Sequence, residues 1–159
     1  MKNENVKLKR NNLDKIKKTV EKFFEKMTFE VELEVGQLKE NTLPLSLKIE
    51  EPQILIGEHG QTLIEIQKVL GRIIRRKIGE QIFIDLDINQ YKKKKIEYLK
   101  EMAQSMADQV ALQKEEKALF PMPSFERRII HMTLSQREDV ETESTGEEPE
   151  RRVVIKPKS

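Results

Sequence analysis

The apolar residues of this chain change repeatedly between the spacing of an α-helix and that of a β-strand, which restricts the fold to a mixed architecture. In the first half, the successive segments cover residues 10–27, 29–35, 43–49, 52–56, 61–79 and 81–87. In chain order, their spacing predicts helix, strand, strand, short helix, helix and strand. We therefore expect an α+β fold whose first domain, residues 10–88, has the order α-β-β-α-α-β.

The second half predicts a smaller domain over residues 89–157, with the order α-β-α-β-β. Its helices and strands are expected near residues 90–110, 117–120, 124–134, 140–145 and 151–155. Asn12, Asn89 and Ser124 are the expected N-caps of three helices, because a short polar side chain accepts a hydrogen bond from the first helical N–H groups. No linker rich in Gly, Ser or Pro separates the halves, so we expect the domains to abut.

The side chains that the chain lacks exclude several classes of protein. It has no cysteine, so it has no disulfide, thiolate zinc site or cysteine nucleophile. His59 and His131 are too far apart for the ligand spacing of a zinc site, and no catalytic motif is present. We therefore expect neither an enzyme nor a metal or other cofactor.

Two further features predict a cytoplasmic protein without membrane insertion. The longest apolar runs have only four or five residues, which is too short to cross a bilayer. Residues 1–10 are polar and lysine-rich, with no apolar segment of a secretory signal behind them.

Gly57 and Gly60 lie just before the predicted helix at residues 61–79. Two glycines separated by two residues let the backbone turn tightly and approach a ligand closely. The helix that follows presents free N–H groups, and its dipole favours a phosphate. The alternative is that the glycines only form a turn between two helices.

The segment Ile56-Gly57-Glu58-His59-Gly60-Gln61-Thr62-Leu63 resembles the I-G-x-x-G-x-x-[I/L] signature of a type II KH domain. In that family the loop clamps the backbone of about four single-stranded nucleotides. The resemblance implies that the loop is formed by Gly57, Glu58, His59 and Gly60. It also implies a groove for the bases, walled by Ile54, Ile56, Leu63 and the strand face of residues 81–86.

Glu58 departs from the basic residue that KH loops often carry, and its carboxylate opposes a phosphate. Arg72, Arg75 and Arg76 offset that charge only if they face the same groove. The alternative for these arginines is a solvated helix face. The same alternative holds for residues 92–95, four consecutive lysines that are either solvated or placed for phosphate.

Arg127 and His131 are four residues apart, so they project from one face of the predicted helix. A guanidinium can fork onto a phosphate, and an imidazole beside it can donate a further hydrogen bond. The same spacing fits a structural histidine and a surface arginine.

Residues 121–131, Pro-Met-Pro-Ser-Phe-Glu-Arg-Arg-Ile-Ile-His, together with residues 142–155, closely resemble the R-x3-H domain. That family binds single-stranded nucleic acid and has a three-stranded antiparallel sheet with helices on one side. The resemblance gives the named motif to Arg127 and His131. Further phosphate contacts are expected from Arg128, Arg151 and Arg152, whereas Glu150 stands where relatives commonly have an aromatic residue.

A KH domain followed directly by an R-x3-H domain resembles the Jag family of bacterial RNA-binding proteins over nearly the whole chain. The separate N-terminal domain of many Jag proteins is expected to be absent, because the first KH helix starts near residue 10. The resemblance implies a cytoplasmic post-transcriptional regulator or RNA chaperone linked to cell envelope or division control. The expected partner is single-stranded RNA, with a small KH protein or a second copy as a further partner.

Two other functions stay open. The first is a KH scaffold that mainly binds a protein and holds RNA weakly, which the acidic Glu58 favours. The second is a nuclease or other enzyme, which the lack of a catalytic constellation opposes. The chain has 30 basic and 28 acidic residues, so its net charge of +2 does not distinguish between these functions. We expect the basic residues to cluster around both phosphate sites.

Overall fold

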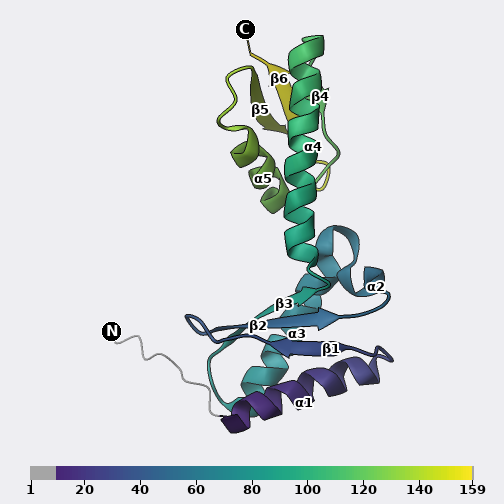
Figure 1. Ribbon diagram of the computed structural model, residues 1–159, viewed down its shortest axis with the longest axis vertical. Coiled ribbons are helices and arrows are strands. Elements are labelled where there is room, and N and C mark those ends of the chain that lie inside the picture. The colour runs from purple at the N-terminus through teal and green to yellow at the C-terminus, as the bar shows by residue number, and fades with distance from the viewer. Residues whose placement is uncertain (1–9, 159) are drawn as a thin grey trace. The chain divides into compact units, whose positions relative to one another are not determined.

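The computed structural model describes residues 10–158, and the expectations for the lysine-rich residues 1–9 lie outside the described residues. The chain forms two compact units that divide after Tyr91 (Figure 1). Both combine helices with a small sheet, which confirms the α+β fold class.

The first unit has the predicted element order. Its elements are α1 (Arg10–Lys26), β1 (Glu32–Val35), β2 (Thr42–Lys48), α2 (Gln53–Ile56), the 3-10 turn η1 (Glu58–Gly60), α3 (Gln61–Ile78) and β3 (Phe83–Ile88). The sheet has the order β1-β2-β3, with β1 antiparallel and β3 parallel to β2. Leu45 of β2 lies opposite Leu86 of β3.

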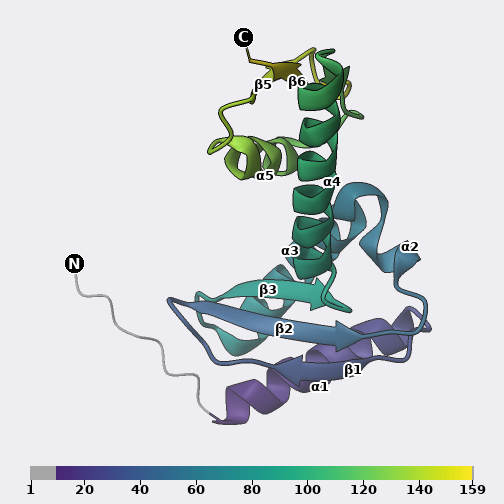
Figure 2. The same ribbon diagram turned by 45° about the horizontal axis from the view of Figure 1, so that its top comes forward.

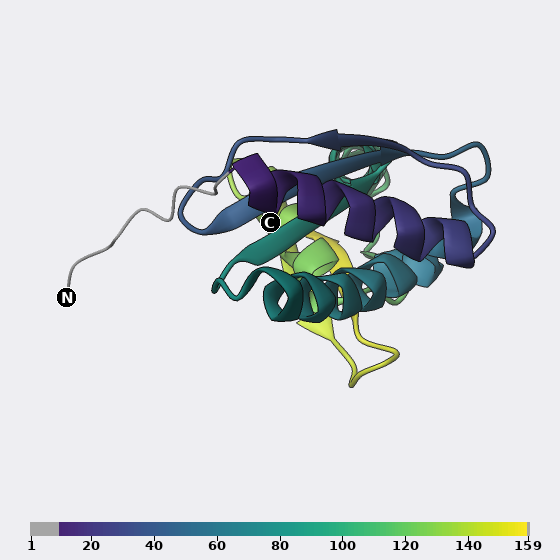
Figure 3. The ribbon, with the colours of Figure 1, turned by 90° about the horizontal axis from the view of Figure 1, so that it is seen from below.

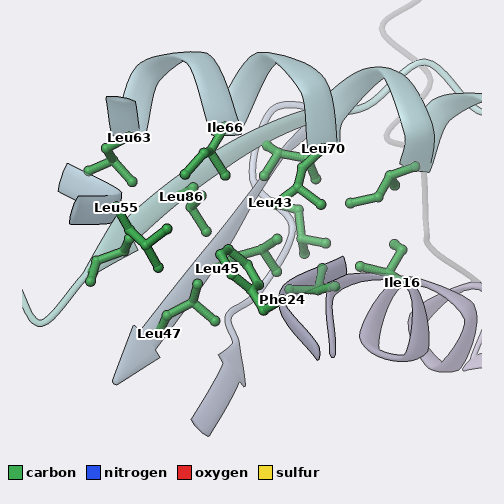
Figure 4. Packing of buried hydrophobic residues seen from close by; sticks show 14 of the residues in the cluster. Ile16, Phe24, Leu43, Leu45, Leu47, Leu55, Leu63, Ile66, Leu70 and Leu86 are labelled. Atoms are coloured by element: carbon green, nitrogen blue, oxygen red, sulfur yellow. The ribbon is translucent and has the colours of Figure 1, made fainter. Parts of the chain in front are cut away.

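The core of the first unit lies between one face of this sheet and two helices. Figure 3 shows α1 and α3 side by side in front of the strands. Alternate residues of β2 point toward the helices because successive strand side chains face opposite sides. Figure 4 shows this packing, which includes Ile16, Phe24, Leu43, Leu45, Leu47, Ile66 and Leu70.

The second unit has the predicted order as well. Its elements are α4 (Tyr91–Gln113, whose first residue closes the first unit), β4 (Lys117–Ala118), α5 (Ser124–Leu134), β5 (Val140–Thr145) and β6 (Arg152–Pro157). The antiparallel sheet has the order β4-β6-β5. Figures 1 and 2 both show α5 beside α4. Its core contains Leu99, Ala103, Ala107, Val110, Ile130, Leu134, Val153 and Ile155.

The three predicted N-caps are wrong, because tertiary contacts or the helix itself use those residues. Asn12 lies inside α1, and its Nδ2 donates to Glu80 Oε1 at 2.6 Å. Asn89 adopts a φ of 51° and bonds both backbone groups of Ile49, at 3.0 and 2.7 Å. Ser124 is the first residue of α5, and the extended Pro123 takes the cap position.

Among residues 10–158, the structure has no helix that is both long and apolar enough to cross a membrane.

Candidate nucleic-acid interface

The first candidate site is the turn from Gly57 to Gly60, which the spacing of its two glycines singled out in the sequence. Gly57 has φ 70° and ψ −178°, a region that only glycine occupies readily. A Cβ at Gly57 would lie 2.1 Å from Thr62 Oγ1 and 3.0 Å from the Thr62 backbone nitrogen. The contact with Oγ1 is far too short and the contact with the nitrogen is tight, so this position requires a glycine for conformation and for space.

Gly60 closes the turn and leads into α3. It is left-handed, with φ 78° and ψ 13°, and its N–H donates to the Gly57 carbonyl at 3.3 Å. His59 is left-handed as well, with φ 49° and ψ 22°. A Cβ at Gly60 would lie 2.8 Å from Cε1 of Tyr91. The turn therefore has a fixed and unusual backbone path.

The start of α3 is open to a negatively charged ligand. The N-cap of this 18-residue helix is Gly60, which has no side chain to accept from the first N–H groups, and the Gln61 N–H donates to the Glu58 carbonyl. These groups carry partial positive charge and bind phosphate well. Glu58 is exposed on the same turn and opposes that attraction. The backbone favours an anion here, and the one acidic side chain of the turn disfavours it.

The residues expected to wall the groove differ in exposure. Ile54 is 70% exposed, whereas Leu63 is only 2% exposed and belongs to the core. Figure 4 shows Leu63 close to Leu55 in the packed layer beneath α3. Ile56 is half-buried. On β3 the apolar residues that alternate along the strand also face the core, and the exposed side chain is Phe83, at 63%. Phe83 is at the start of β3, next to Ile82, which bonds Arg75 near the C-terminal end of α3, so the accessible apolar surface at the loop is Ile54 and part of Ile56.

The arginines of α3 do not lie at the loop. Arg72 follows Gly60 by twelve residues, which corresponds to about 18 Å along an α-helix. That separation exceeds the screening length of about 8 Å at physiological salt. Arg75 Nη1 donates to the Ile82 carbonyl at 3.2 Å, and Arg76 is exposed near the C-terminal end of α3. Arg72, Arg75 and Arg76 therefore cannot offset Glu58.

The second candidate site centres on Arg127, in the first turns of α5. The residue is only 8% exposed. Its Nη1 donates to the Met122 carbonyl at 2.7 Å and to Glu148 Oε1 at 2.8 Å. Glu148 lies on the loop between β5 and β6, with an exposed side chain. One partner is thus a backbone carbonyl of the buried Met122, and the other is a carboxylate on the surface.

His131 lies one turn after Arg127 and is fixed by β5. Its Nδ1 and Nε2 lie 2.7 Å from Thr142 Oγ1 and Ser144 Oγ, respectively. Burial, and then the nearby charge of Arg127, lower the pKa of His131 from its usual 6.5. The neutral ring accepts from one hydroxyl and donates to the other. The further hydrogen bond expected for a phosphate therefore has no ring nitrogen left, and His131 joins α5 to β5.

The remaining predicted cations are divided between exposed and paired side chains. Arg128 is exposed on α5. Arg151 Nη1 donates to the Gly146 carbonyl at 3.4 Å, and Arg152 Nη2 pairs with Glu150 Oε2 at 3.3 Å. Among residues 92–95, Lys95 pairs with the buried Glu126 at 3.3 Å and Lys93 with Glu97 at 4.0 Å. Acidic side chains of the same unit thus compensate much of the predicted basic surface.

Sequence reasoning missed an exposed stripe on α5. Phe125 is 61% exposed and Met132 63% exposed, and the exposed Arg128 lies between them at helical spacing. The signal was present, because Phe125 and Met132 are out of phase with the buried residues Ile130 and Leu134. We call Phe125, Arg128 and Met132 the α5 stripe. An exposed aromatic ring beside a guanidinium suits a nucleic-acid base.

Within the described part of the chain, no three His, Asp or Glu side chains are grouped so as to hold a metal ion.

The comparison with protein families finds an R-x3-H domain over residues 97–157. The chain is also similar to bacterial proteins named RNA-binding protein KhpB. The one from Clostridium symbiosum is 34% identical over 143 residues, which cover 89% of this chain and 64% of the relative. The one from Bacillus subtilis is 36% identical, covering 75% of this chain and 58% of the relative. The one from Streptococcus pneumoniae D39 is 29% identical, covering 72% of this chain and 35% of the relative.

The chain spans less than two thirds of the length of each of these relatives. The matched R-x3-H region includes Arg127 and His131, the two motif residues of the second candidate site. The chain carries an R-x3-H domain and is a homologue of proteins named RNA-binding protein KhpB.

Proposed function

We propose that this chain binds single-stranded RNA through two backbone-binding sites, one in each unit. The single observation that carries the proposal is the Arg127–Glu148 pair inside the R-x3-H domain. The Met122 carbonyl fixes the guanidinium, and the exposed carboxylate that faces it mimics a phosphate in charge and hydrogen bonding. RNA binding then exchanges Glu148 for a phosphate oxygen, so Arg127 needs little rearrangement.

The loop Gly57–Gly60 is the second site of the proposal, as part of a KH domain at residues 10–88. Its conformation requires glycine at both ends, and the uncapped start of α3 offers N–H groups to a phosphate. Bases would contact the exposed apolar side chain of Ile54, three residues before the loop. In the second unit, a base would stack on Phe125 while Arg128 contacts the backbone.

The cellular role in this proposal is that of a non-enzymatic, cytoplasmic regulator or RNA chaperone. The similarity to proteins named RNA-binding protein KhpB supports RNA as the ligand. A link to cell envelope or division control, and a small KH protein as partner, rest on the resemblance to the Jag family. The 89–157 region would act as the R-x3-H module.

The test is fluorescence anisotropy with a labelled 12-nucleotide RNA that cannot fold on itself. We expect saturable binding at 50 mM salt, and competition by unlabelled single-stranded RNA that is stronger than competition by an RNA duplex. Phosphate contacts supply most of the affinity, so binding should weaken steeply at 200 mM salt. A lack of binding at 50 mM salt would contradict the proposal.

A second candidate function is a protein-interaction module with weak RNA binding. The observation that favours it is Glu58, an exposed carboxylate on the loop that the distant arginines of α3 do not compensate. Size-exclusion chromatography with light scattering, with and without RNA, separates the two functions. A monomer that forms a one-to-one RNA complex supports RNA binding, whereas a dimer that RNA does not change supports the interaction module.

A further inference from the structure

The glycine-rich turn rests on an aromatic ring that no motif predicted. Tyr91 follows β3 and is the last residue of the first unit. Its side chain is half-buried and packs against the core of that unit. The ring faces Gly60, because a Cβ built there would lie 2.8 Å from Tyr91 Cε1 and 3.2 Å from its hydroxyl oxygen.

The two glycines of the turn are thus supported by different residues. Gly57 lies against Thr62, a residue of α3 itself, whereas Gly60 lies against Tyr91, which comes thirty-one residues later. The far end of a flexible side chain could move away, but the Tyr91 ring is held by the core. The position of the Gly60 end is therefore set by packing from outside the motif.

We infer that Tyr91 is a positioning residue for RNA binding, which holds the Gly57–Gly60 turn in the conformation that accepts the backbone. The inference rests on the proposed function and extends it to a residue that contacts the loop from behind. An untethered turn would sample other conformations, and RNA would have to select the competent one, which reduces the apparent affinity. Tyr91 thereby tunes affinity without touching RNA.

A double-mutant cycle tests this role, since coupled residues give non-additive effects and independent ones do not. Tyr91→Ala should weaken binding of the labelled 12-nucleotide RNA about fivefold, and Tyr91→Phe, which keeps the ring against Gly60, should weaken it less. Gly60→Ala introduces a methyl group against the ring. In the Tyr91→Ala background that contact is gone, so Gly60→Ala should reduce the RNA affinity clearly less there than in the wild type.

The chain offers a matched control for this cycle. A methyl group at Gly57 meets Thr62 and not Tyr91, so Gly57→Ala and Tyr91→Ala should combine additively. Additive effects of Gly60→Ala and Tyr91→Ala, or wild-type affinity for Tyr91→Ala, would overturn the inference. If the wild type itself binds no RNA, the proposed function fails. If the wild type binds RNA and Tyr91→Ala binds it equally well, only this inference fails, so the two failures are distinguishable.

Intrinsic fluorescence gives a second readout that does not depend on the stability of Tyr91→Ala. The chain has no tryptophan and only two tyrosines, so Tyr98→Phe leaves Tyr91 as its single tyrosine. RNA added to Tyr98→Phe should change the tyrosine emission with the midpoint found by anisotropy. Adding Gly57→Ala to that variant should reduce the change severalfold. Emission that stays constant while RNA binds would overturn the inference.

Discussion

The two proposed RNA sites differ in the groups that bind phosphate, which are backbone groups in one and a side chain in the other. In the first unit the site is backbone: glycines at positions 57 and 60 and the uncapped start of α3. In the second unit it is the side chain of Arg127, held by hydrogen bonds to the Met122 carbonyl and to Glu148. The backbone site needs glycines, because a side chain at those positions would clash. The side-chain site needs hydrogen-bonding partners that orient it, and such a partner can also compete with the ligand.

Both sites contain a carboxylate that opposes RNA, but in different ways. Glu58 is exposed on the turn, where it only repels a nearby phosphate. Glu148 accepts a hydrogen bond from Arg127 and must be displaced. The comparison therefore predicts larger effects of mutation in the second unit, and the following changes test it in order of expected size.

Arg127→Ala should have the largest effect, weakening RNA binding at least tenfold. It removes the fixed guanidinium and leaves the Met122 carbonyl without that donor, so the free energy of unfolding should also fall by about 2 kcal/mol. Anisotropy and urea unfolding measure the two effects. Arg128→Ala removes the same charge from an exposed site, and it should weaken binding about threefold without a change in stability. Equal losses of affinity would contradict the special role of Arg127.

His131→Ala should lower the free energy of unfolding by about 2 kcal/mol at pH 7.5, because Thr142 and Ser144 lose their partner. The folded state lowers the pKa of His131, so the unfolded state binds more protons as the pH falls below 6.5. Wild-type stability should therefore decrease from pH 7.5 to 5.5, and the variant should lack this part of the decrease. Parallel urea-unfolding profiles for the two proteins would show that the pKa shift contributes nothing.

Phe125→Ala should weaken binding about fivefold, since one stacked base contributes about 1 kcal/mol. The ring is exposed, so thermal unfolding should hardly change. Leu112→Ala is the matched control, because it removes an exposed apolar side chain of α4 that lies outside the α5 stripe. If both variants bind RNA as the wild type does, the α5 stripe takes no part in binding.

Glu148→Gln should tighten binding about threefold, because a neutral amide competes less with phosphate for Arg127. Glu147→Gln changes the net charge equally at the neighbouring exposed position and controls for long-range attraction. Anisotropy at 100 mM salt compares them. The same gain in both variants would mean that general charge is responsible and that Glu148 is no specific competitor.

Glu58→Ala should have the smallest effect, a tightening of about twofold, because the carboxylate acts through solvent and salt. Titration at 50 and 200 mM salt should show the gain shrinking at the higher salt. A loss of affinity would mean that Glu58 contacts the ligand favourably, which would strengthen the interaction-module alternative.

The fold was largely predictable because the apolar spacing is regular. Strict alternation from Leu43 to Ile49 and helical spacing from Leu63 to Ile74 each specify one buried face. The caps were not predictable, since the side chains of Asn12 and Asn89 bond to residues remote in sequence, Glu80 and Ile49.

The positions of the site residues were predictable, but their hydrogen-bonding partners were not. The sequence placed Arg127 and His131 on one helical face, but it did not indicate that Thr142, Ser144 and Glu148 already occupy their hydrogen-bonding groups. Those partners come from the hairpin that follows α5, and only tertiary structure brings them there. The distance of the α3 arginines from the loop, in contrast, follows from the rise of a helix and was available from the sequence.

The central claim, two phosphate-binding sites of different construction, is tested most directly by the salt dependence of RNA affinity. The slope of log Kd against log salt should be measured for the wild type, Gly57→Ala and Arg127→Ala with the same 12-nucleotide RNA. Each lost phosphate contact reduces the slope by about 0.7 for a single strand. We predict a reduced but nonzero slope for both variants. Wild-type slopes in both variants would contradict the claim.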